Sequence, residues 1–187
     1  MNSDSQKGHN HRRHAGRDDL AGEHRLGDTL QLVFLATFLA IWISDSFFLQ
    51  YSTFPAEMIP NYVRTSLGIL FLVIAGLLSW RGLRKVFGEV RETPQVITGG
   101  AFSIVRHPIY LGSILTYLGM VCFSMSLASA AFWIVIVVFY RYISRYEENL
   151  LINRFGDEYR DYMKKVPMLF PLKLFRKGAS DSISNLP

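Results

Sequence analysis

The chain has 187 residues, 50% of them hydrophobic, and a formal net charge of +5 at pH 7. That length suits one domain with one core. The charge does not indicate a nucleic-acid partner, because the basic residues gather in short stretches between long apolar runs. Basic residues beside anionic lipid headgroups account for such a distribution.

Residues 1–25 are polar and carry His9, His11, His14 and His24. They lack the apolar period of an amphipathic helix, which predicts a flexible tail. The close spacing of three of these histidines leaves a metal site open as the alternative. We expect a solvated arm and no metal.

Four apolar runs follow, at 29–48, 63–80, 109–123 and 127–140. The first two approach the roughly 20 residues that cross a bilayer. The first is also too long for the core of a signal peptide, so we expect it to remain as an anchor. The last two are shorter and are joined only by Ser124-Met125-Ser126, which predicts a tight helical hairpin.

Lysines and arginines precede the first run, lie between the second and third, and follow the fourth, whereas 50–61 and 124–126 contain none. By the positive-inside rule this alternation predicts four transmembrane helices with both termini in the cytoplasm. The fold class is therefore an all-α integral membrane protein. A fifth helix lying in the interface stays open.

Two unusual residues lie inside these runs. Asp45 is near the outer end of the first run, where we expect its carboxylate to reach water and not to form a functional site. Cys122 is the only cysteine, and we expect it to act as a small apolar residue.

The third run is preceded by Gly-Gly-Ala-Phe-Ser-Ile-Val-Arg-His-Pro-Ile-Tyr-Leu-Gly at 99–112. Pro94 and the glycine pair predict a bent cytoplasmic loop. Pro108 suits the first turn of a helix, so we expect His107 just before the helix in an extended conformation. The free N–H groups of that helix end suit an anionic group.

From 144 to 165, apolar and aromatic residues recur in steps of three and four, which predicts a C-terminal amphipathic helix. Gly156 interrupts the pattern as a candidate bend, and Val166-Pro167 ends it. We divide the chain into the tail 1–25, one membrane domain at 26–172 and a C-terminal tail at 173–187.

The hairpin brings Arg106, His107 and Tyr110 next to Glu147 and Glu148 at one membrane surface. Such a set can bind a cationic or zwitterionic small molecule. Alternatively, the two glutamates pair with nearby arginines on a solvated helix surface, where each pair contributes little. Spacing alone leaves both interpretations open.

The motif at 100–110, the pair Glu147-Glu148, the segment 155–162 and Val166-Pro167 together resemble the isoprenylcysteine carboxyl methyltransferases. The related phospholipid N-methyltransferases share part of this pattern. The resemblance covers roughly residues 85–172 and implies S-adenosylmethionine as the methyl donor and S-adenosylhomocysteine as a product. It implies binding without a Rossmann unit, and the chain has no strand, Gly-rich loop and helix in that order.

The resemblance also implies a set of cofactor-binding residues. These are Pro94, Gln95, Val96, Ile97, Gly100, Phe102, His107, Pro108, Tyr110, Leu111, Glu147 and Glu148.

The implied reaction is attack by the C-terminal carboxylate of a prenylated cysteine on the donor's methyl group. A carboxylate is ionised at neutral pH and needs no general base. The isoprenylcysteine enzymes have an arginine one turn before the first glutamate, where this chain has Ile143. Arg141 and Arg145 are therefore the candidates to orient the substrate, with Glu147 beside the reacting groups.

Two other functions are compatible with the sequence. Methylation of a phospholipid amine requires loss of a proton, so a base such as His107 would matter more. A non-catalytic membrane adaptor would bind no cofactor. In either enzyme the lipophilic substrate enters from the bilayer, and the sequence does not decide between a monomer and a homo-oligomer.

Overall fold

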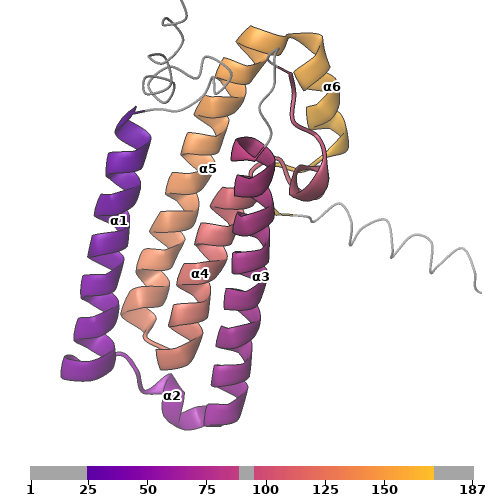
Figure 1. Ribbon diagram of the computed structural model, residues 1–187. Coiled ribbons are helices and arrows are strands. Elements are labelled where there is room, and N and C mark those ends of the chain that lie inside the picture. The colour runs from indigo at the N-terminus through magenta and orange to yellow at the C-terminus, as the bar shows by residue number, and fades with distance from the viewer. Residues whose placement is uncertain (1–24, 89–94, 171–187) are drawn as a thin grey trace, which may run out of the picture.

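The computed structural model describes residues 25–88 and 95–170, and over these residues the regular elements are all helices (Figure 1). The long helices run side by side, with the short α2 at one end of the bundle and α6 at the other. The elements are α1 Arg25–Ile43, the π-helical turn η1 Ser44–Leu49, α2 Pro55–Met58, α3 Asn61–Phe87, the 3-10 turn η2 Gly100–Ser103, α4 Pro108–Ser124, α5 Leu127–Phe155 and α6 Asp157–Lys165. Pro94, residues 1–24 of the predicted N-terminal tail and the predicted tail at 173–187 lie outside the described residues.

Three helical segments are long and apolar enough to cross a membrane: Thr29–Leu49, Asn61–Phe87 and Leu127–Phe155. In the most apolar window of the first two, only 11% of the residues are buried inside the protein. Large apolar side chains such as Leu32 and Val138 are 65% and 62% exposed. Because soluble proteins rarely expose apolar surface on this scale, these faces are in contact with lipid. The chain is an integral membrane protein.

The remaining long helix, α4, has 17 residues and spans about 25 Å, less than the roughly 30 Å core of a bilayer. The number of four spans therefore stays a prediction. In contrast, α5 continues well past the fourth apolar run to Phe155, so the predicted amphipathic helix is the end of α5 together with α6. Gly156 separates the two with a φ of 56°, which confirms the predicted bend.

Small residues let α3 and α4 approach each other closely. A Cβ on Gly112 would lie 3.0 Å from the carbonyl oxygen of Ala75, and one on Gly119 would lie 3.0 Å from that of Gly68. Small residues commonly allow such approach in membrane helices. The glycines of α4 thus serve packing against α3.

The tight hairpin between α4 and α5 is confirmed. Met125 adopts a left-handed conformation at the end of α4, and its N–H donates to the carbonyl of Val121 over 2.7 Å. Ser126 then caps α5 by accepting a hydrogen bond from the N–H of Ser129 over 3.1 Å.

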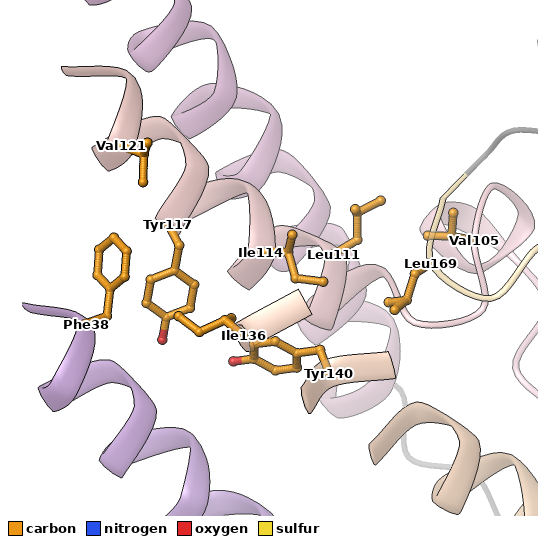
Figure 2. Close-up of a cluster of buried hydrophobic side chains, with 9 residues drawn as sticks. All are labelled: Phe38, Val105, Leu111, Ile114, Tyr117, Val121, Ile136, Tyr140 and Leu169. Atoms are coloured by element: carbon orange, nitrogen blue, oxygen red, sulfur yellow. The ribbon is translucent and has the colours of Figure 1, made fainter. Parts of the chain in front are cut away.

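The core lies between α1, α4 and α5 (Figure 2). The ring centroids of Phe38 on α1 and Tyr117 on α4 are 4.7 Å apart, and Ile114 and Ile136 are fully buried beside them. At the α6 end of the bundle, Leu169 joins the same cluster. The core therefore extends from the middle of the helices to the segment after α6.

Asp45 does not reach water, so the expectation for its carboxylate is wrong. It is 5% exposed and accepts hydrogen bonds from the hydroxyls of Ser52 and Ser126, each over 2.5 Å. Ser126 belongs to the hairpin turn, distant in sequence, so the carboxylate ties η1 to that turn. Sequence spacing could not show this, because the contact depends on how α1 packs against the hairpin.

Candidate active site

The site is built around the first turn of α4. Pro108 is the first residue of this helix and His107 precedes it, which confirms the predicted helix start. The φ of −122° and ψ of 68° of His107 lie outside the helical region but do not reach the extended conformation that was expected. The N–H groups of Arg106 and His107 donate to the carbonyls of Pro167 and Met168 over 2.9 and 3.1 Å. The segment after α6 thereby fixes the backbone that carries both side chains.

His107 is 8% exposed and lies between two carboxylates. Its Nε2 is 3.3 Å from Oε1 of Glu148, and its Nδ1 is 3.5 Å from Oε2 of Glu147. Burial lowers the pKa of His107, but the hydrogen bonds and charges of the two glutamates outweigh burial and raise the pKa above its ordinary value of 6.5. The arrangement therefore favours the imidazolium, which can donate to both carboxylates.

The two glutamates have different environments. Glu148 is 3% exposed and accepts a hydrogen bond from Nε of Arg106 over 2.7 Å. The side chain of Glu147 is 18% exposed and accepts a hydrogen bond from the hydroxyl of Tyr110. Glu148 is thus neutralised inside the protein, whereas Glu147 is the carboxylate that a ligand can reach.

Arg106 links this cluster to the far end of α6. Its Nη1 donates to the carbonyls of Met163 and Val166 over 2.9 and 2.7 Å, while Nε holds Glu148. Only 8% of the side chain is exposed. We call Arg106, His107, Tyr110, Glu147 and Glu148 the charged cluster.

A cavity of about 140 Å³ has Arg106 in its lining. It is lined by Val86, Gln95, Val96, Ile97, Phe102, Arg106, Leu151, Phe155, Tyr159 and Tyr162. The hydroxyl of Tyr162 donates to the carbonyl of Phe102 over 2.5 Å, which fastens η2 to α6. Burial raises the pKa of both Tyr159 and Tyr162, so their phenols stay neutral.

The structure brings most of the predicted site residues together. His107, Tyr110, Glu147 and Glu148 meet in the charged cluster. Gln95, Val96, Ile97 and Phe102 line the cavity.

Other predicted residues are placed elsewhere. Leu111 is buried in the core, Pro108 is buried in the first turn of α4, and Gly100 is exposed with nothing within 4 Å of its Cβ position. Arg141 and Arg145 are exposed on α5, and among the described residues neither lies within ion-pair distance of a glutamate. Their role in orienting a substrate stays a prediction.

Arg106 was expected in the charged set at the membrane surface but not among the cofactor-binding residues. The aromatic wall formed by Phe155, Tyr159 and Tyr162 was not predicted. A signal for Tyr159 and Tyr162 was present, because both lie on the apolar face of the predicted helix. That α6 folds back over the loop at 95–102 could not be inferred from the pattern alone.

Comparisons with known proteins concern the same part of the chain. A family model described as Phospholipid methyltransferase matches residues 63–158. The chain is 34% identical over 117 residues to Methanethiol S-methyltransferase 2 of Bradyrhizobium diazoefficiens, covering 57% of this chain and 42% of the relative. It is 33% identical over 94 residues to the Protein-S-isoprenylcysteine O-methyltransferase of Mus musculus, covering 50% and 32%.

A third relative has a different kind of name. The Nickel-cobalt-cadmium resistance protein NccN of Alcaligenes xylosoxydans xylosoxydans is 32% identical over 92 residues, covering 48% of this chain and 43% of the relative. The chain thus spans less than half the length of each of these curated relatives. Because the matched segment 63–158 is half of the chain and contains the whole charged cluster, the chain belongs to the phospholipid methyltransferase family.

Proposed function

We propose that the protein transfers a methyl group from S-adenosylmethionine to a lipophilic acceptor at the membrane surface. One observation carries this proposal: Arg106 joins an aromatic-lined cavity to the charged cluster, in which Glu147 is a partly exposed carboxylate, at the end of a lipid-exposed helix bundle. Family membership and relatives named as methyltransferases support it. The positive-inside pattern supports a cytoplasmic location for the site and for both termini.

The residues present fit the chemistry of such a donor. Aromatic faces in the cavity, Phe102, Tyr159 and Tyr162, suit an adenine ring and also attract cations. Glu147 suits a positively charged sulfonium or ammonium group. The cavity is smaller than the roughly 300–1,000 Å³ of a typical ligand pocket. Residues 89–94, which directly precede Gln95, lie outside the described residues.

When bound, S-adenosylmethionine supplies a methyl group on a sulfonium, which passes to the nucleophile and leaves S-adenosylhomocysteine. The protein's part is to orient and to exclude water. Arg106 and Glu148 hold His107 in place, and His107 and Tyr110 fix Glu147. Because Glu147 is held from two sides, it loses little freedom when a cation binds to it.

For the acceptor we propose the C-terminal carboxylate of a prenylated cysteine. A groove of about 460 Å³ between α1 and α4 gives the lipid tail a path, with Leu32, Leu35 and Met120 among its lining residues. The groove reaches Tyr140, whose ring is 5.2 Å from that of Tyr110 in the charged cluster. Arg141 or Arg145 would orient the carboxylate, which needs no base.

A small thiol is the second candidate acceptor. The relative named Methanethiol S-methyltransferase 2 favours it, as does the buried apolar Ile143 one turn before Glu147. A thiol has an ordinary pKa near 8.5, so it must lose its proton before it attacks. Its methylation should therefore rise with pH, whereas methylation of a carboxylate should stay flat near neutrality.

The test is methyl transfer from labelled S-adenosylmethionine by the full chain in detergent. A farnesylated cysteine analogue, methanethiol and phosphatidylethanolamine are offered in parallel. We expect methylation of the farnesylated analogue, its loss in Glu147→Gln, and its retention in Glu158→Gln, which changes an exposed carboxylate on α6. Methylation of methanethiol alone would show that the acceptor is a small thiol. Methylation of phosphatidylethanolamine alone would show that it is the amine of a lipid headgroup. If no acceptor is methylated and no cofactor binds, the proposal that the protein transfers methyl groups is refuted.

A further inference from the structure

Another cavity, with both charged and apolar residues in its lining, is at the opposite end of the bundle from the charged cluster. It has a volume of about 430 Å³, is open to the surroundings, and is lined by residues of the end of α1, η1, α2, the start of α3 and the end of α4. The 17 residues of α4 separate it from His107, a distance of about 25 Å. The cavity therefore belongs to the other membrane surface, because its lining includes Ala56 and Glu57 of α2, the helix that Figure 1 shows at that end of the bundle.

Arg64 brings a positive charge to this cavity. Its Nη1 donates to the carbonyl of Phe123 over 3.1 Å, and its Nη2 donates to Oδ1 of Asn61 over 3.3 Å. Both acceptors are neutral, and among the described residues no carboxylate lies within ion-pair distance of Arg64. Its charge is therefore not compensated by the protein.

Polar atoms at the cavity also lack partners. The buried Nε of Arg64 and the buried Oγ of Ser46 have no hydrogen-bond partner, and both residues line the cavity. Such groups are costly to leave unsatisfied, more so where the surroundings are apolar. The neighbouring carboxylate of Asp45 does not serve them, because Ser52 and Ser126 occupy its oxygens.

A negative charge lines the same cavity. Glu57 on α2 is exposed there, and no ion pair joins it to Arg64 in the described residues. One unpaired cation and one unpaired anion around a single cavity match a ligand that carries both charges. A phosphate would face Arg64, and an ammonium group would face Glu57.

The surroundings place this cavity at the level of lipid headgroups. The first candidate span ends at Leu49 and the next begins at Asn61. Exposed aromatic side chains surround the connection: Phe48 is 79% exposed, Tyr51 89% and Tyr62 74%. Aromatic residues gather at membrane interfaces because one end of the ring prefers lipid and the other water.

We propose that this cavity binds the headgroup of a zwitterionic phospholipid, with Arg64 on its phosphate and Glu57 on its amine. The site is separate from the proposed methyl-transfer site and does not depend on that activity. The bound lipid neutralises Arg64 and fills the space between α2 and the ends of α1, α3 and α4.

The test is lipid binding by the delipidated full chain in detergent, followed by native mass spectrometry and thermal unfolding. Phosphatidylcholine and phosphatidylethanolamine are compared with anionic phosphatidylglycerol and with soluble glycerophosphocholine. We expect the two zwitterionic lipids to bind and raise the unfolding midpoint, and the soluble headgroup to bind at least about tenfold more weakly because it lacks the acyl chains.

Variants separate the two halves of the site. Arg64→Gln should weaken binding of the zwitterionic lipids about tenfold, as expected for the loss of one charged hydrogen bond. Glu57→Gln removes an exposed charge that has no partner to lose, so it should fold normally and lose the preference for zwitterionic over anionic lipid. Arg81→Gln, the same change at an exposed position on the other end of α3, should bind as the unaltered chain does.

Equal affinity for zwitterionic and anionic lipid in the unaltered chain would overturn the proposal. So would unchanged lipid preference in Glu57→Gln, which decides the matter if Arg64→Gln does not fold. The proposal would also be overturned if soluble glycerophosphocholine bound as tightly as the lipid, because the cavity would then bind a free solute.

Discussion

Replacing Arg106 by methionine should destabilise the protein more than the same replacement at an exposed arginine. The substitution removes the donor to Glu148, which is 3% exposed, and leaves the carbonyls of Met163 and Val166 without that partner. Removing one partner of a buried ion pair costs about 3–5 kcal/mol, because the other charge stays buried.

For a chain of this length, each kcal/mol shifts the unfolding midpoint by about 2–4 °C. We therefore expect Arg106→Met to lower the midpoint in detergent by roughly 6–20 °C. Arg160→Met is the matched control, because Arg160 is 59% exposed and its pair with Asp157 is solvated. That control should leave the midpoint nearly unchanged.

A double variant tests the physical reason. If the cost comes from the uncompensated carboxylate, Arg106→Met with Glu148→Gln should be more stable than Arg106→Met alone by about 1 kcal/mol or more. If the decrease in the free energy of unfolding in the double variant equals the sum of the decreases in the two single variants, Arg106 and Glu148 are not coupled. A loss in Arg106→Met no larger than in Arg160→Met would refute the reasoning as well.

Three further predictions concern pH, helix packing and the hairpin turn. Because the pKa of His107 is raised in the folded protein, its stabilising contribution is complete below pH 6.5 and is lost as the pH rises through the folded-state pKa. The unfolding midpoint should therefore fall over that pH range, and His107→Gln should make the midpoint less dependent on pH. Gly112→Ala should lower the free energy of unfolding by about 1–3 kcal/mol, because the added methyl group overpacks α4 against α3. In the control Gly76→Ala, the Cβ would meet nothing within 4 Å, so this change should be neutral or slightly stabilising. Equal unfolding midpoints for the two variants would contradict this packing. Asp45→Ala should lower the midpoint without changing the affinity for cofactor, because Asp45 ties η1 to Ser126 far from the charged cluster; weaker cofactor binding in the folded variant would contradict a purely structural role.

The sequence allowed prediction of the helical membrane fold and of the α4–α5 hairpin, because both follow from local patterns. Apolar runs predict helices, and two helices joined only by Ser124-Met125-Ser126 must lie side by side as a hairpin. The His107-Pro108 boundary was equally local, since proline fixes the first turn of α4.

Contacts between elements distant in the sequence were harder to predict. The approach of Glu147 and Glu148 to His107 followed from the hairpin, but the split between a reachable and a buried glutamate did not. That split depends on Arg106, whose side chain is held by the carbonyls of Met163 in α6 and Val166 just after it. The burial of Asp45 has the same origin, because Ser126 reaches it only after α1 packs on the hairpin.

The most direct measurement is the affinity for S-adenosylhomocysteine by calorimetry in detergent, for the unaltered chain, Glu147→Gln and Glu158→Gln. Glu147 is the reachable carboxylate of the charged cluster, whereas Glu158 is exposed on α6. We expect the unaltered chain and Glu158→Gln to bind with the same affinity, and Glu147→Gln to bind at least about tenfold more weakly through loss of a charged contact. Absence of binding to the unaltered chain, or equal binding by all three, would contradict a methyl-donor site at Glu147.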